Sequence, residues 1–218
     1  MALTKTTEPS GKCIRDGRYT RSKVKANKQT KALEAIIGAP QITLKQHIDA
    51  RITADDAAID ARAEQDAREE DLQDAHGVLS AKLFGESGSY DSDIYRAVFA
   101  IAPSKLAALA EADRRKGYIL VNDAIAKGVP KSCDIAAKAA LAAHADYAKA
   151  YGNRETADKL LTDAEKAEAK ARDNWHTAIR QLKAQLTNLF PRDAKKVLRF
   201  FPAAPKAKKA AASPDQPV

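Results

Sequence analysis

The sequence predicts an all-α fold: an elongated antiparallel helical bundle with two long helices at about residues 43–84 and 154–190. Neither range contains Pro, and Gly77 is the only Gly in them. Both are rich in Ala, Leu and charged residues, most of which lose little side-chain freedom in a helix. Aromatic residues make up only 6% of the 218-residue chain, and no stretch alternates β-branched with polar residues for long, so strands are not predicted.

The apolar stripe of the first long helix is narrow. Leu44, Ile48 and Ile52 share one side early, and Leu79 and Leu83 continue it near the end. Between residues 60 and 71 the stripe consists of Ala alone. A helix with so thin a stripe needs a partner helix along its length, which favours an antiparallel hairpin or bundle.

Gly and Pro mark the expected helix ends. Gly38-Ala-Pro40 is expected to stop a short helical turn before the first long helix begins. Two shorter helices are predicted, at 104–127 and 132–151, and Gly152-Asn153 is expected to separate the latter from the second long helix.

The two long helices resemble each other at a shift of 103 residues. Nine of the 31 positions from 53 to 83 are identical to those from 156 to 186, and a Leu-Phe pair and a short amphipathic helix follow each copy. This favours an internal duplication, although convergence of two Ala-rich helices explains the same matches. Six aromatic residues are expected in or near the core: Trp175, Phe84, Phe99, Phe190, Phe200 and Phe201.

The net charge of +8 is unevenly distributed. Residues 1–31 hold nine basic and two acidic residues, residues 191–218 hold seven and two, and the stretch between them holds 21 and 25. The predicted organisation is therefore a basic flexible tail at 1–32, a helical bundle at 33–202 and a Lys/Ala/Pro-rich tail at 203–218.

No catalytic or cofactor motif is present, so the chain is not predicted to be an enzyme and no cofactor or metal is expected. If the chain were an enzyme, the candidate nucleophile would be Cys133, which is at a predicted helix N-terminus beside Lys131. Its sequence neighbours offer no histidine within reach to act as a base. With two cysteines and no long apolar run, a reducing cytoplasm is the expected location.

Two functions are weighed. The first is a non-enzymatic structural or scaffold protein that associates with itself or with a helical partner. The alternative is sequence-nonspecific binding of nucleic acid or another polyanion through the basic ends. The Lys/Ala/Pro-rich segment 202–214 is similar in composition to the tails of linker histones and bacterial histone-like proteins. The candidate contact residues are the cations of both ends: Lys12, Arg15, Arg18, Arg21, Lys23, Lys25, Lys28, Lys31, Arg192, Lys195, Lys196, Arg199, Lys206, Lys208 and Lys209.

Overall fold

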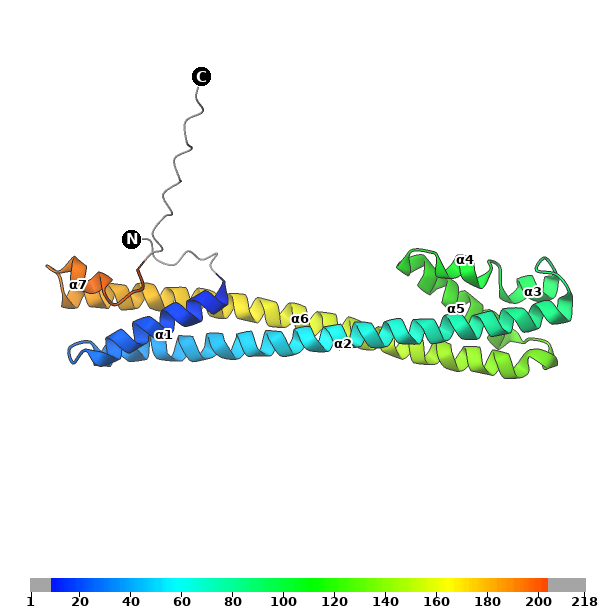
Figure 1. Cartoon of the computed structure of the whole chain (residues 1–218), viewed down its shortest axis with the longest axis horizontal. Helices are drawn as coiled ribbons and strands as arrows, with labels where there is room; N and C mark the ends of the chain where they lie inside the picture. Colours follow the sequence, from blue (N-terminus) through cyan, green and yellow to red (C-terminus); the bar gives the residue numbers. More distant parts are fainter. Residues whose placement is uncertain (1–8, 204–218) are drawn as a thin grey trace, which may run out of the picture. The chain divides into compact units, whose positions relative to one another are not determined.

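The structure is a computed structural model that describes residues 9–203, and over these residues it consists of helices and turns without a strand (Figure 1). Two helices, α2 with 54 residues and α6 with 56, are far longer than the others. The all-α prediction is confirmed. In chain order the elements are α1 (Ser10–Ala26), the 3₁₀ turn η1 (Lys31–Leu33), α2 (Glu34–Ser87), α3 (Asp93–Val98), α4 (Pro103–Ala107), α5 (Glu111–Lys127), the 3₁₀ turn η2 (Lys131–Cys133), α6 (Asp134–Leu189) and α7 (Ala194–Leu198).

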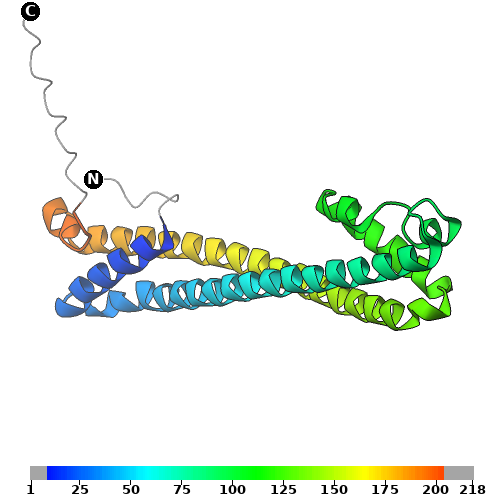
Figure 2. The same ribbon diagram turned by 45° about the vertical axis from the view of Figure 1, so that its right-hand side comes forward.

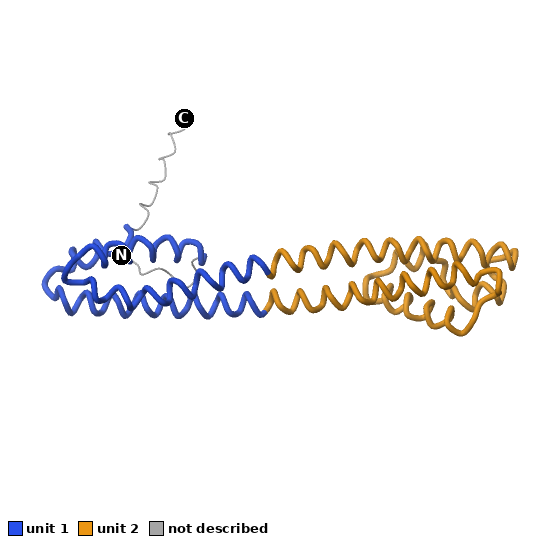
Figure 3. Tube along the Cα trace, turned by 90° about the horizontal axis from the view of Figure 1, so that it is seen from below, with its two compact units in different colours: residues 1–53, 163–218 blue, residues 54–162 orange. Residues whose placement is uncertain are grey.

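The chain divides into two compact units (Figure 3). Unit 1 comprises Met1–Thr53 and Asp163–Val218, and unit 2 comprises Ala54–Thr162. Unit 1 therefore contains α1, the first part of α2, the last part of α6 and α7. Unit 2 contains the last part of α2, α3, α4, α5 and the first part of α6.

Within unit 1, α2 and α6 run antiparallel (Figure 2). Trp175 Nε1 donates a hydrogen bond to Gln41 Oε1 at 2.7 Å, and Arg51 Nε donates to Glu168 Oε2 at 2.7 Å. The partner's number on α6 falls as the number on α2 rises, as antiparallel packing requires. The core of this unit includes Cys13, Val24, Ile37, Leu44, Trp175, Leu182, Leu186, Val197 and Phe200.

Unit 2 pairs the same two helices in the same sense. Arg62 Nη2 donates to Asp158 Oδ1 at 2.7 Å, and Arg154 Nη1 donates to Gln65 Oε1 at 3.1 Å. The core of unit 2 includes Leu72, Leu79, Leu83, Tyr95, Phe99, Leu106, Tyr118, Val121, Ile125, Cys133 and Tyr147.

The expected aromatic core is confirmed with one exception. Trp175, Phe99 and Phe200 are buried, and Phe190 and Phe201 pack against the core of unit 1. Phe84 is instead 37% exposed and stacks on Tyr90 with ring centroids 4.4 Å apart.

Two expected helix breaks are wrong, because α2 continues through Pro40 and α6 continues through Gly152. Pro inside a helix costs about 3 kcal/mol and Gly about 1 kcal/mol. Buried side chains flank both positions: Ile37 and Leu44 around Pro40, and Ala150 and Ala157 around Gly152. Packing of these neighbours outweighs the local preferences.

Two further expectations are corrected. The predicted helix at 104–127 is two helices, α4 and α5. The predicted flexible tail at 1–32 contains α1, whose Cys13 and Val24 are fully buried. Residues 1–8 and 204–218, and with them most of the C-terminal tail, lie outside the described residues. None of the described helices has the length and apolarity that crossing a membrane requires.

Apart from α4, which only unit 2 contains among the described residues, the two units share one set of elements. Each contains a 17-residue helix, a 3₁₀ turn, the start of one long helix and the end of the other, followed by a short helix. At the shift of 103 residues, buried positions also coincide: Leu72, Leu79 and Leu83 correspond to Trp175, Leu182 and Leu186. Duplication stays a prediction, but these coincidences are the ones it requires.

Candidate functional site

The candidate cations of both chain ends belong to unit 1. Six of them lie on α1, two follow it before α2, and four lie on or beside α7. The last three, Lys206, Lys208 and Lys209, lie outside the described residues. Cations that are far apart in the sequence therefore belong to one folded unit rather than to two tails.

Small residues hold α1 in place. Its buried positions are Ser10, Cys13, Gly17, Thr20 and Val24, spaced by three or four so that they share one face. At Gly17 a side chain would have no room, because a Cβ there would lie 1.8 Å from Gln41 Oε1 and 2.9 Å from Trp175 Nε1. Gln41 is itself fixed, since its Nε2 donates to the carbonyl oxygen of Ile14 at 2.8 Å.

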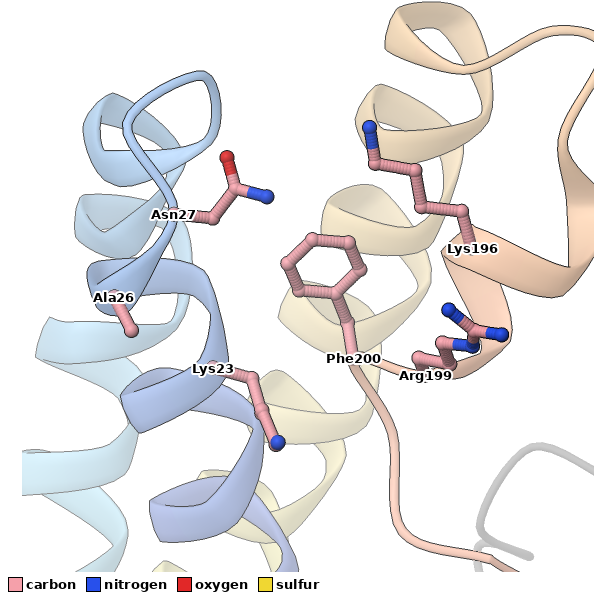
Figure 4. A pocket seen from close by; sticks show the side chains of 6 residues that line it. All are labelled: Lys23, Ala26, Asn27, Lys196, Arg199 and Phe200. Carbon is pink, nitrogen blue, oxygen red and sulfur yellow. The ribbon is translucent and has the colours of Figure 1, made fainter.

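A pocket lies between the C-terminal end of α1 and α7 (Figure 4). Its volume is about 490 Å³, within the range of small-molecule sites. We call it the basic pocket, and its lining consists of Lys23, Ala26, Asn27, Lys196, Arg199 and Phe200. Figure 4 shows the Phe200 ring between Asn27 on one side and Lys196 on the other.

The polar groups of the basic pocket are hydrogen-bond donors. Lys23, Lys196 and Arg199 carry only donors. The Asn27 Oδ1 accepts a hydrogen bond from the backbone N–H of Gln29 at 3.0 Å, which leaves its NH₂ group as the remaining donor. Such a lining favours a ligand rich in acceptors and negative charge.

Neither lysine of the pocket nor its arginine is neutralised by a carboxylate within residues 9–203. Some other cations of unit 1 do pair with carboxylates, as Arg21 does with Glu34 and Arg51 with Glu168. The ammonium of Lys196 instead lies 3.9 Å from the centroid of the Phe190 ring, a cation–π contact that positions it.

The structure brings a cysteine and a histidine together, but not the cysteine that the sequence singled out. Cys13 Sγ lies 3.9 Å from His176 Nε2, and both residues are at least 98% buried beside Trp175. Cys133 is fully buried in the core of unit 2. Because neither sulfur is exposed, neither cysteine is a candidate nucleophile for an external substrate.

Unit 2 contains a buried polar cluster. Glu69, only 6% exposed, forms an ion pair with Arg114 and accepts a hydrogen bond from the Tyr118 hydroxyl at 3.2 Å. The Tyr118 hydroxyl in turn accepts from Gln73 Nε2 at 3.1 Å. Burial, together with the charge of Glu69, raises the pKa of Tyr118 well above its usual value. Because these bonds join side chains of α2 and α5, the cluster is best explained as a device that fixes how α5 packs on α2.

His76 lies beside this cluster, between the rings of Phe99 and Tyr118 at centroid distances of 5.8 and 5.6 Å. It is 1% exposed, and its Nε2 has no hydrogen-bond partner among the described residues. Burial, reinforced by the charge of His144, lowers its pKa to about 4. Within residues 9–203, no three His, Cys, Asp or Glu side chains are grouped closely enough to hold a metal ion.

Sequence reasoning named the three cations of the basic pocket but neither Asn27 nor the role of Phe200. The missed signal was the spacing of small residues along α1, which marks a packed helix. No protein-family model, no curated protein and no solved structure matches this chain.

Proposed function

We propose that the chain is a non-enzymatic helical protein that binds polyanions, nucleic acid foremost, through unit 1. The observation that carries this proposal is the segregation of charge between the units. Unit 1 holds 23 Lys and Arg against 10 Asp and Glu, a net charge of +13, whereas unit 2 holds 14 against 19, a net charge of −5. Concentrated positive charge attracts phosphate backbones without reading sequence.

The test is a duplex-DNA titration at about 50 and about 200 mM salt, since binding through phosphate contacts weakens steeply over this range. Truncating α1 is a poor variant because it would uncover Gln41 and Trp175. Neutralising exposed cations keeps the core intact. The test variant replaces four exposed cations of unit 1 by Gln: R15Q, R18Q, K25Q and K28Q.

A matched control removes the same charge from unit 2. It replaces four exposed lysines by Gln: K127Q, K138Q, K149Q and K159Q. The unit 1 variant is expected to flatten the dependence of log K on log salt by up to about 0.9 for each lost phosphate contact. Equal losses in both variants, or no binding at about 50 mM salt, would refute polyanion binding through unit 1.

A second function, self-association, is favoured by the surface of unit 2. This unit is acidic, and it exposes large apolar side chains, among them Ile135 at 86%, Leu120 at 69% and Leu160 at 60%. Unit 2 of one copy is thus complementary in charge to unit 1 of another. Sedimentation over a wide concentration range tests for self-association. The measurement is repeated at higher salt, because contacts between opposite charges should weaken there. A strictly monomeric protein at every concentration would exclude it.

A further inference from the structure

The basic pocket carries a more specific inference, which rests on the proposed binding of polyanions by unit 1. We propose that it binds the phosphate-monoester group of a nucleotide, either as a free mononucleotide or as the phosphorylated end of a strand. A nucleic-acid backbone offers phosphodiesters with one negative charge each, whereas a monoester carries close to two at neutral pH. The three cations of the pocket, which no carboxylate of the described residues neutralises, therefore suit a phosphate monoester better than a phosphodiester.

The geometry supports a ligand larger than phosphate itself. A pocket of about 490 Å³ leaves space for an organic body beside the phosphate. Ala26 and the ring of Phe200 supply apolar lining for that body, while Lys23, Lys196 and Arg199 supply charge. The NH₂ group of Asn27 adds a neutral donor held in place by the hydrogen bond of its oxygen to Gln29. A nucleotide combines these requirements in one molecule.

The partial negative charge at a helix C-terminus attracts cations by itself. That effect accounts for lysines in the last turns of α1 and α7, but it makes no distinction between those that line the pocket and those that do not. Lys25 and Lys195 also lie in these last turns, yet neither lines the pocket. They provide matched controls for Lys23 and Lys196.

The experiment compares two double variants of the full chain, K23Q/K196Q and K25Q/K195Q, by calorimetric titration with adenosine 5′-monophosphate. Each loses two positive charges from the same two helices. The pocket variant is expected to lose about tenfold or more in affinity, because it removes two cations that would donate charge-assisted hydrogen bonds to the phosphate. The control is expected to stay within about twofold, because neither of its side chains lines the pocket and salt screens their charges. Circular dichroism confirms that both variants fold.

Adenosine and inorganic phosphate serve as probes of the two halves of the ligand. Adenosine should bind far more weakly than the monophosphate, and phosphate should compete with it. Equal losses in the two double variants would overturn the proposal, as would the absence of monophosphate binding at millimolar concentration. If the protein fails this test but still binds duplex DNA in a salt-dependent way, only the nucleotide site is refuted and the proposed polyanion binding is not. The failure of one proposal is therefore distinguishable from the failure of the other.

Oligonucleotides distinguish the two sources of the phosphate. A single strand with a 5′-phosphate is compared with the same strand ending in a hydroxyl, at the salt concentration used for the duplex. Tighter binding of the phosphorylated strand, lost in K23Q/K196Q, assigns the pocket to strand ends. Equal binding of the two strands, with monophosphate binding retained, assigns it to free nucleotides.

Discussion

Gly17 is the position at which one methyl group should have the largest effect on unit 1. In Gly17→Ala the new Cβ would lie 1.8 Å from Gln41 Oε1 and 2.7 Å from Gln41 Cδ. Gln41 cannot move away without loss, because it accepts from Trp175 Nε1 at 2.7 Å and donates to the carbonyl oxygen of Ile14 at 2.8 Å. The substitution therefore breaks these bonds or lifts α1 from the core.

The magnitude follows from these contacts. Two hydrogen bonds contribute about 1 kcal/mol each, and a buried indole N–H without a partner costs about 1–3 kcal/mol more. Replacing Gly by Ala inside a helix returns up to about 1 kcal/mol. We expect Gly17→Ala to lower the free energy of unfolding by about 2–4 kcal/mol. Gly11→Ala, in the same helix with no atom within 4 Å of its Cβ, should keep or raise it.

Urea unfolding followed by tryptophan fluorescence measures this change in the free energy of unfolding. Trp175 is the single Trp of the chain, so the signal comes from the site of the substitution. Gly17→Ala should also weaken nucleotide binding, because Lys23 and Asn27 reach the basic pocket from α1. A double variant with Gln41→Ala isolates the clash, and the cost of Gly17→Ala should be smaller in that background. Equal stability of Gly17→Ala and Gly11→Ala would refute this account of how α1 packs.

Three further predictions concern stability. The pKa of His76 is about 4 in the folded protein against 6.5 unfolded, so only the unfolded chain takes up this proton between these pH values. Stability should therefore fall by about 3 kcal/mol as pH drops from 6.5 to 4, and urea titrations across pH should show a shallower fall in His76→Leu. Glu69→Gln breaks the buried pair with Arg114 and should cost about 2–4 kcal/mol by urea unfolding, whereas exposed Glu70→Gln should change stability by less than about 0.5 kcal/mol. Gly152→Ala, exposed inside α6 with open space at its Cβ, should raise the melting temperature through a gain of about 0.5–1 kcal/mol.

The sequence sufficed for the fold class because the long helices depend on composition and on an apolar stripe that recurs every three to four residues. It failed at Pro40 and Gly152, where local preference and tertiary packing disagree. The unfavourable helix propensity of Pro and Gly can be predicted from a single sequence, but the tertiary contacts that compensate for it cannot. Both helices were therefore predicted too short.

The prediction of a flexible N-terminal tail was wrong for a different reason. Its buried face consists mainly of Cys13, Gly17, Thr20 and Val24, of which only Val24 is a branched aliphatic residue. Close packing of α1 onto α2 and α6 requires small residues, and a hydrophobicity pattern does not register them. Once α1 is taken for a tail, neither the joining of both basic ends in unit 1 nor the basic pocket can be predicted.

Comparison of the two units shows that their shared elements alone do not produce the basic pocket. Asp193 and Ser92 cap α7 and α3 in the same way, each accepting a hydrogen bond from the backbone N–H three residues on. Aligned on these caps, Phe200 corresponds to Phe99, but the positions of Lys196 and Arg199 correspond to two buried residues of unit 2, Tyr95 and Val98. Unit 2 thus places apolar or aromatic groups into its core where unit 1 places cations around a pocket.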